Sequence, residues 1–543
     1  MMYDTVKSMK DLKPAFVRLL LAFLVFQFAI IGQVQAKSKR HMVIYGGLSA
    51  ADLYPIAQNI DILVLGNISH KYLRQLKTLN PDLILLLYHH APGLHKHNPQ
   101  WNFVNQNEDW FVHDRSSGKR LVEKKYGWFL MNNANENWRE FMAKKIVKNT
   151  PSIFDGIFID DFWNRYIHKF HPEGMPSKAW PREEIIDNWV DNMVLLIERI
   201  RERFPKLIYI NGAYREYIQY VDGCMIEGFV HPNWKPDSYQ PDPFKYKQTL
   251  LKIEALKKYG KTLLLQSGTT EMRPNTTRKI YDFCHASYLL VEDKNTSFGF
   301  HPLHTYRYIG IPFIDKFKMS IGRPQGKFYS VKEPRPAPNL VPNGDFNHGL
   351  QHWLVLQGSP KPGTGQTLKK SAILFKSRSG KADKIRSGFI TVKANTRYRL
   401  AAICKSEMNR AGSARYKKLG LQGRFYDSQK RKLPGAFDLQ FDPGAYTWRP
   451  FETTYTSPAG AAYFRLRLGF IGDGIGKGWV DRVYFGFASV SGRVLGRDFS
   501  GGKVLVNYGT AETKIKYKSV ENQSGSASLT LMPAEGRIIL QKK

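Results

Sequence analysis

The stretch FDGIFIDDFW, residues 154–163, decides the fold that this sequence predicts. An apolar run rich in β-formers ends abruptly on two aspartates, Asp160 and Asp161, and aromatic residues follow. A continuous apolar run is typical of a parallel strand that is buried on both faces. The two carboxylates at its end indicate either a polar turn or a site on the rim of a barrel.

Seven more short apolar runs alternate with helical stretches in the same part of the chain. One connection, residues 181–204, has the apolar spacing of an amphipathic helix, with Pro181 just inside its start. Eight strands alternating with helices over roughly 260 residues predict a (β/α)8 TIM barrel. A doubly wound open sheet is the alternative, but no glycine-rich phosphate loop follows the first run. The seven runs are residues 42–47, 61–67, 83–90, 207–212, 223–229, 262–268 and 297–302.

The length of 543 residues predicts two or three domains. Residues 40–335 form the predicted barrel, and a proline-rich linker leads into a region of short strands, glycines and aromatic residues. We expect residues 339–490 to fold as an all-β, jelly-roll sandwich. Residues 494–541 are expected to form a small C-terminal β-domain that packs on the barrel.

Residues 1–36 predict export. Basic residues precede a short apolar core at residues 19–32, and small residues, Val34 and Ala36, stand at the expected cleavage positions. This pattern is typical of a cleavable signal peptide, and the core is short for a membrane span. An uncleaved anchor is the alternative. Either way, the body is expected in the periplasm, on the cell surface or outside the cell.

The charge balance indicates anionic partners. The formal net charge is +35 and the isoelectric point is near 9.8. Such a balance suits an acidic polysaccharide, an envelope surface or nucleic acid. The basic residues are scattered, however, and no nucleic-acid-binding motif accompanies them, so nucleic acid is not an expected partner. The three cysteines rule out a disulfide framework and lack the spacing of a metal site.

Barrel enzymes build their sites at the carboxyl ends of the strands, so the last residues of each run are the candidate site. Glycoside hydrolysis needs two carboxyl groups that flank the scissile bond. Asp160 ends the fourth run and Glu227 the sixth, which places one strand between them and leaves both retaining and inverting separations open. Beside this pair, the strand-end candidates are Tyr45, Asn67, Tyr88, His89, His90, Asp161, Asn211, Gln266 and His301.

Within the doublet we expect Asp160, rather than Asp161, to face the barrel mouth, because successive strand side chains point to opposite faces. Asp161 is then a neighbour that raises the pKa of Asp160. A helix cap or a salt bridge is the structural alternative for the doublet, and an ion pair is that for Glu227. His89 and His90 are a weak metal signal. Candidates for stacking on sugar rings are Tyr45, Tyr88, Phe162, Trp163, Phe229 and Trp234.

These segments resemble hypothetical TIM-barrel glycosyl hydrolases, which are similar in pattern to endo-α-1,4-polygalactosaminidase-like barrels. The resemblance implies that Asp160 is the nucleophile or base and Glu227 the general acid. It is carried by DGIFIDDFW (155–163), YINGAY (209–214), GCMIEGF (223–229), DWFVHDRSSGKRL (109–121), MNNANENWREF (131–141) and the tail at 497–540. The residues expected to bind substrate are Tyr45, Tyr88, His89, Asp161, Trp163, Asn211, Gln266 and His301.

The inserted region resembles jelly-roll carbohydrate-binding modules at NLVPNGDFNHGLQHWLV (339–355) and GWVDRVYFGFASV (478–490). The resemblance implies a structural calcium ion at Asp345 and Asp481, whereas catalysis is expected to need no cofactor. A spacer that binds nothing is the alternative. The aromatic residues expected to hold a glycan are Trp353, Tyr416, Tyr426, Tyr446 and Trp448.

The sequence therefore predicts an exported glycoside hydrolase that cleaves a polysaccharide, one that is acidic or contains amino sugars. Two alternatives stay open. The first is a non-catalytic glycan-binding envelope protein that uses the same cleft, and the second is a lipopolysaccharide-binding protein that relies on charge alone.

Overall fold

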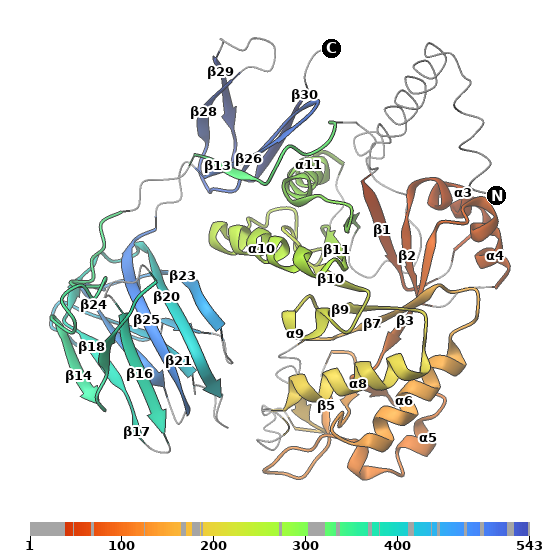
Figure 1. The fold of residues 1–543 in the computed structure, drawn as a ribbon, viewed down its shortest axis with the longest axis horizontal. Helices are drawn as coiled ribbons and strands as arrows, with labels where there is room; N and C mark the ends of the chain where they lie inside the picture. The colour runs from red at the N-terminus through yellow and green to blue at the C-terminus, as the bar shows by residue number, and fades with distance from the viewer. Residues whose placement is uncertain are drawn as a thin grey trace, which may run out of the picture.

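Eight parallel strands close into a barrel in the computed structural model of the chain (Figure 1), so the predicted (β/α)8 barrel is confirmed. β12 pairs with β1 to complete the circle. Each predicted apolar run supplies one strand. In spatial order the strands are β1 (Lys39–Ile44), β2 (Ile62–Leu65), β3 (Ile84–His90), β7 (Gly156–Asp160), β9 (Leu207–Asn211), β10 (Gly223–Glu227), β11 (Thr262–Ser267) and β12 (Thr296–Phe300).

The structure describes most of the chain after residue 37. The predicted signal peptide, Asn67, Pro181 and Tyr416 lie outside the described residues. The described residues are 38–46, 48–66, 70–123, 125–163, 170–175, 185, 188–270, 274–301, 321–332, 337–366, 372–378, 381–410, 418–435, 437–441, 446–471, 475–488, 493–518 and 526–540. Among them, no helix has the length and apolarity that a membrane span requires.

Helices cover the outside of the barrel, as the alternating pattern predicts. The longer ones are amphipathic, and they bury one face against the strands. At the start of α6, the Asn135 side chain caps the helix by accepting a hydrogen bond from Trp138 N at 3.1 Å. The helices are α3 (Ala50–Asn59), α4 (His70–Leu79), α5 (Trp101–Val104), α6 (Glu136–Asn149), α8 (Trp189–Arg203), α9 (Arg215–Ile218), α10 (Pro243–Leu256) and α11 (Pro274–Val291).

The barrel interior is filled with side chains below a polar rim. A cluster of apolar residues from the strands is buried inside it, so the barrel is a packed core and not a pore. The members of this cluster are Val43, Ile62, Val64, Leu86, Phe158, Tyr209, Met225 and Leu264.

A small antiparallel sheet is built from the connections that follow β3 and β7. Sequence reasoning did not predict it, because its strands are only three residues long and carry no period that a pattern can show. It places Trp128 beside the carboxyl end of β3. Its strands, in spatial order, are β4 (Gly93–His95), β6 (Trp128–Leu130), β5 (Leu121–Glu123) and β8 (Phe170–Pro172).

Two antiparallel sheets with a shared apolar core follow the barrel, in the region where a sandwich was predicted. β19 (Ile390–Thr391) pairs with β24, and β17 (Lys381–Ala382) with β16. The first sheet has the order β14 (Trp353–Gln357), β18 (Lys384–Ser387), β24 (Tyr463–Ile471), β21 (Lys418–Tyr426) and β22 (Phe437–Gln440). The second has the order β15 (Lys361–Gly363), β16 (Ala372–Arg378), β25 (Ile475–Phe487), β20 (Arg397–Arg410) and β23 (Tyr446–Thr456).

The C-terminal strands form a further sheet that packs on α11. Arg497 is 6% exposed, and its guanidinium donates to the carbonyls of Leu289 and Glu292, both at 2.9 Å, at the carboxyl end of that helix. β13 belongs to this sheet, so the segment predicted as the end of the barrel supplies one strand of it. The order is β13 (Tyr329–Lys332), β26 (Val494–Phe499), β27 (Gly502–Asn507) and β30 (Glu535–Leu540), beside a hairpin of β28 (Thr513–Lys518) and β29 (Ser526–Leu531).

Candidate active site

The two predicted carboxylates meet at one amide group on the rim. Asn211 ends β9, the strand between β7 and β10, and its side chain is buried. Its Nδ2 atom donates to Asp160 Oδ1 at 2.8 Å and to Glu227 Oε2 at 3.0 Å. Two contacts on one nitrogen hold these oxygens within roughly 6 Å of each other, close to the short separation found in retaining glycosidases.

Two tyrosines from neighbouring strands surround Asp160. Tyr88 Oη donates to Asp160 Oδ2 at 2.6 Å. The ring of Tyr45 contacts that of Tyr88 edge to face, with centroids 5.1 Å apart. Burial and then the charge of Asp160 raise the pKa of both phenols well above their ordinary value. Both side chains therefore stay protonated and can donate hydrogen bonds.

The protonation of Asp160 is governed by opposing influences. Burial raises the pKa of its carboxyl above the ordinary value, and the charge of Asp161 raises it further, as the sequence predicted. Hydrogen bonds from Tyr88 and Asn211 lower the pKa, and so does the neighbouring His90. Within the described residues, no lysine or arginine pairs with Asp160, so neutral donors alone hold a carboxylate beside a second one.

The two adjacent aspartates differ in backbone conformation: Asp160 ends strand β7, and Asp161 leaves the strand conformation. Asp161 has a φ of 58°, a left-handed conformation that few residues other than glycine adopt. Its N–H donates to Asp160 Oδ1 at 2.7 Å, while its own Oδ2 lies 3.2 Å from His90 Nε2. A Cβ at Gly212, after β9, would lie 2.0 Å from Phe162 O. Glycine is therefore required where the two strand ends approach each other.

His90, and not His89, is the histidine that the structure brings to this site. Its ring stacks on Trp128 with centroids 4.1 Å apart, and its Nδ1 lies 3.1 Å from Gly93 O. Strand alternation gives the reason, since His90 shares a face with Tyr88, two residues earlier. That alternation was the signal available in the sequence, once the direction of Tyr88 was known.

The predicted substrate role of His89 is corrected by its position. Its Nε2 lies 3.1 Å from the hydroxyl of Thr150, which follows α6 on the outside of the barrel. Burial, together with the charge of Lys145, lowers the pKa of His89 to about 4. His89 is therefore a neutral side chain packed between strand and helix.

Gln266 lies next to Glu227 on the rim, since the two residues are register partners of β11 and β10. Its side chain is 3% exposed, and within the described residues its Oε1 atom is buried without a hydrogen-bond partner. Such an acceptor is costly unless a donor reaches it. His301 is also buried, and it lies close enough to His41 to lower the pKa of that histidine.

Several predicted stacking residues are core residues instead. Phe162 and Phe229 are buried, which leaves no open ring face for a sugar. Trp163 is partly buried against the barrel core, and its carbonyl accepts a hydrogen bond from Trp189 Nε1 at 3.0 Å. Trp234 is 40% exposed and lies over Gly228, directly after β10.

The sandwich shows the same mixture of roles. Trp353 is buried in its core against Phe346, so it is not a surface platform. Tyr426 contacts Phe389 edge to face, with centroids 5.1 Å apart. Trp448 is partly exposed, and the side chain of Tyr446 lies outside the described residues.

The predicted calcium residues hold local hydrogen bonds. Asp345 is exposed and accepts from the side chain of Asn347 at 2.5 Å. Asp481 is buried and accepts from the backbone N–H groups of Gln366 and Arg482, both at 2.8 Å. In the described part of the chain, no group of three or more His, Cys, Asp or Glu side chains is placed to hold a metal ion. The calcium site stays a prediction.

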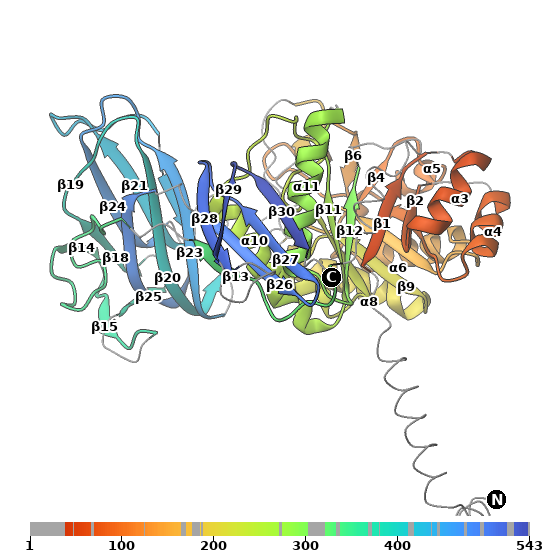
Figure 2. The same cartoon turned by 90° about the horizontal axis from the view of Figure 1, so that it is seen from above.

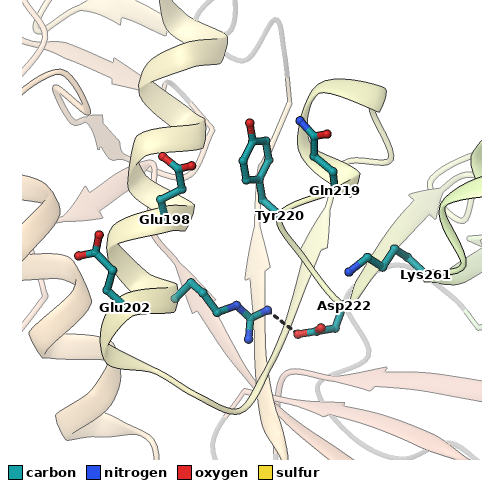
Figure 3. A pocket seen from close by; sticks show the side chains of 7 residues that line it. Glu198, Glu202, Gln219, Tyr220, Asp222 and Lys261 are labelled. Atoms are coloured by element: carbon teal, nitrogen blue, oxygen red, sulfur yellow. Dashed lines mark hydrogen bonds and ion pairs between the residues drawn. The ribbon is translucent and has the colours of Figure 1, made fainter.

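A separate cavity of about 650 Å³ lies beside α8, and side chains from α8 and from the segments before β10 and β11 line it (Figure 3). Arg201 and Asp222 form an ion pair on its wall, with 2.5 Å between Nη2 and Oδ2. Asp222 and Lys261 directly precede β10 and β11, which places the cavity at the amino ends of the strands, away from the carboxylate pair. Its lining residues are Glu198, Arg201, Glu202, Gln219, Tyr220, Asp222 and Lys261.

Residues 77–341 match the family described as "Hypothetical glycosyl hydrolase family 15", a match that covers a little under half of the chain. The predicted family resemblance is confirmed. The match includes both members of the carboxylate pair and supports the predicted enzyme class, a glycoside hydrolase. A search of curated proteins gave no match.

Solved structures show only distant similarity. The glycoside hydrolase domain of PelA from Pseudomonas aeruginosa is 12% identical, over 50% of this chain and 98% of that one, with a TM-score of 0.38. Aspergillus fumigatus Ega3 in complex with galactosamine is 11% identical, over 50% and 94%, with a TM-score of 0.32. The xylan-binding domain CBM22-1 of Paenibacillus barcinonensis Xyn10C is 12% identical, over 29% and 100%, with a TM-score of 0.21. These scores are too low to carry an argument about activity.

Proposed function

We propose that the chain is an exported glycoside hydrolase that cleaves a polysaccharide between Asp160 and Glu227. The observation that carries the proposal is the bridging amide of Asn211, whose one nitrogen donates to both carboxyl groups. Two carboxylates held this close repel each other, and a reaction that needs two carboxyl groups gives a reason for that arrangement.

In this proposal Asp160 is the nucleophile and Glu227 the general acid. Three donors, Tyr88 Oη, Asn211 Nδ2 and Asp161 N, point at the oxygens of Asp160, which suits a carboxylate that acts in its ionised form. Glu227 gives its proton to the leaving glycosidic oxygen while Asp160 bonds to the anomeric carbon. A water molecule then breaks that ester as Glu227 takes up the proton of the water.

The short separation of the two carboxyl groups favours retention of the anomeric configuration. An inverting enzyme leaves room for a water molecule between substrate and base, with carboxyl groups about 6.5–9.5 Å apart. The shared contact on Asn211 keeps the nearest oxygens within roughly 6 Å, which favours direct attack by the carboxylate.

The charge of the chain favours an acidic substrate over an amino-sugar polymer with free amines. A net charge of +35 attracts a polyanion and repels a polycation at low ionic strength. Of the two substrate classes that the sequence left open, the acidic polysaccharide therefore fits better. Gln266 and His301 on the rim, with Tyr45 and Tyr88, are the groups proposed to hold its hydroxyls.

The test is release of reducing ends from a panel of acidic, amino-sugar and neutral polysaccharides. We expect release by the parent protein and a loss of roughly 10²–10⁴-fold in both Asp160→Asn and Glu227→Gln. Glu198→Gln, an exposed carboxylate by the distant cavity, is the matched control and should keep parental activity. No release by any protein, with equal retention of all of them on one glycan, would instead favour the non-catalytic glycan-binding protein.

A further inference from the structure

The sandwich carries a cluster of cations on the outer face of its first sheet and on the turn after β21. Along each of these strands the alternate residues are buried in the sandwich core, so the cationic side chains point away from that core. We refer to the cluster as the arginine face. It consists of Lys384, Arg386, Arg424, Lys430, Arg465 and Arg467.

The register of the sheet sets these arginines against one another. Arg386 of β18 is the direct partner of Arg467 of β24, and Arg424 of β21 is the direct partner of Arg465 of β24. Opposite residues in an antiparallel pair have Cβ atoms about 4.5–5.5 Å apart, and like charges at this distance destabilise the sheet. Burial and then the charge of Arg386 lower the pKa of Arg465, Tyr426 raises it, and the charge of Arg467 lowers it further.

Little negative charge offsets this repulsion. Arg424 pairs with Asp438 of β22 at 3.1 Å. Among the described residues, no acidic side chain pairs with Arg386, Arg465 or Arg467, and the buried Nε atom of Arg386 has no hydrogen-bond partner. The face therefore keeps unneutralised guanidinium groups that an external anion can reach.

An aromatic ring fixes two members of the face. The Arg465 guanidinium carbon lies 4.1 Å from the centroid of the Phe389 ring, and Lys430 Nζ lies 5.3 Å from it. Tyr426 and Tyr463 contact the same ring edge to face. Cations held on a ring lose less freedom when a ligand binds, which favours binding.

The arginine face points away from the barrel. Figures 1 and 2 both place β14, β18 and β24 on the far side of the sandwich. The opposite sheet is the one that contacts the barrel, where Arg397 of β20 pairs with Asp242 at 3.3 Å. The face is therefore open to a long ligand.

We propose that the arginine face binds an acidic polysaccharide through the carboxylates of successive sugar residues. Guanidinium groups match carboxylates with two parallel hydrogen bonds, and a row of them suits a ligand that repeats one anionic group. The site lies apart from the carboxylate pair of the barrel. It would hold a polymer whether or not the barrel cleaves it, so this proposal goes beyond the proposed function.

An anionic membrane surface is the other ligand that such a face suggests. Leu354 on the edge strand β14 is 55% exposed and is the direct partner of Arg386. Arg386, Arg424 and Arg465, however, are half-buried. They and the exposed Arg467 lie within strands of the sheet and not at a protruding tip that would enter lipid. An extended chain can follow a sheet face over several strands, which favours the polysaccharide.

The test measures binding of the full chain to polygalacturonate, with neutral dextran and phosphatidylglycerol vesicles as the comparison ligands. We expect the parent to bind polygalacturonate but not dextran, with an affinity that falls steeply as salt is added. The variant Arg386→Gln/Arg467→Gln should bind polygalacturonate at least tenfold more weakly. Its thermal unfolding should occur at the same or a higher temperature, because the mutual repulsion is removed.

The matched control is Lys361→Gln/Lys393→Gln, which removes two exposed charges from the sandwich outside the face and should bind within twofold of the parent. An equal loss in both double variants would overturn the proposal in favour of net charge alone. Binding to vesicles without binding to polygalacturonate would overturn it in favour of a membrane site. Because binding is measured without turnover, an absence of cleavage leaves this result unaffected.

Discussion

The two ends of strand β7 carry the same chemical group in opposite settings. At the amino end, Asp155 pairs with Lys77 at 2.8 Å and accepts the N–H of Leu85 on the neighbouring strand at 2.7 Å. At the carboxyl end, Asp160 accepts hydrogen bonds from neutral donors and has a second carboxylate nearby. The first arrangement stabilises the barrel, and the second makes a reactive group available.

The amino-end arrangement recurs around the barrel. Asp61 stands before β2 and accepts the N–H of Arg40 at 2.8 Å, and Asp222 stands before β10 and accepts the N–H of Ile208 at 2.9 Å. In each case the carboxylate binds the backbone of the adjacent strand. In this barrel an aspartate before a strand therefore stabilises the pairing of adjacent strands, whereas an aspartate at the carboxyl end of a strand can take part in a reaction.

The largest expected effect is at the bridge between the two carboxylates. Asn211→Ala removes the donor that Asp160 and Glu227 share, so the two groups lose their common position. We expect activity on the cleaved polysaccharide to fall roughly 10²–10³-fold, as when one donor to a reacting group is removed. Steady-state kinetics measure it. An Asn211→Ala protein with parental activity would show that the bridge does not position the pair.

At the amino end the expected loss is in stability. Asp155→Ala removes the partner of Lys77 and of Leu85 N–H, and we expect the free energy of unfolding to fall by about 1–3 kcal/mol with activity preserved. Asp82→Ala is the matched control, an exposed aspartate just before β3, and should change it by less than about 0.5 kcal/mol. Denaturant unfolding distinguishes them. A loss of activity with no loss of stability would reverse the assignment of the two ends.

The sequence predicts the strands and the carboxylate pair better than it predicts the contacts within the site. All eight strands could be found, because each is a continuous apolar run that burial on both faces requires. Asp160 and Glu227 followed from their positions after those runs. The choice between His89 and His90 could not be made, because it depends on which face of β3 looks inward. The bridging contact of Asn211 depends on strand register, which no local pattern encodes.

The arginine face was hidden in the sequence for the same reason. Arg386 and Arg467 are far apart along the chain and become neighbours only through the pairing of β18 with β24. The scattered basic residues therefore read as an ordinary solvated surface. The short strands of the small sheet that carries Trp128 were equally invisible, because three residues show no period.

The smallest expected effect is a gain in stability at the carboxyl end. Because folding raises the pKa of Asp160, the folded chain holds this proton more tightly than the unfolded chain does. The stability that the proton contributes is complete below the pKa of the unfolded chain and is lost as the pH rises through the pKa of the folded one. Asp160→Asn stays neutral and avoids that loss. We therefore expect its free energy of unfolding at neutral pH to exceed that of the parent by roughly 0.5–2 kcal/mol, and its unfolding temperature to be higher. The difference should shrink as the pH falls toward about 4, which thermal unfolding between about pH 4 and pH 8 measures. A variant less stable than the parent at neutral pH would mean that the carboxylate form of Asp160 stabilises the fold, and the two ends of β7 would then be alike.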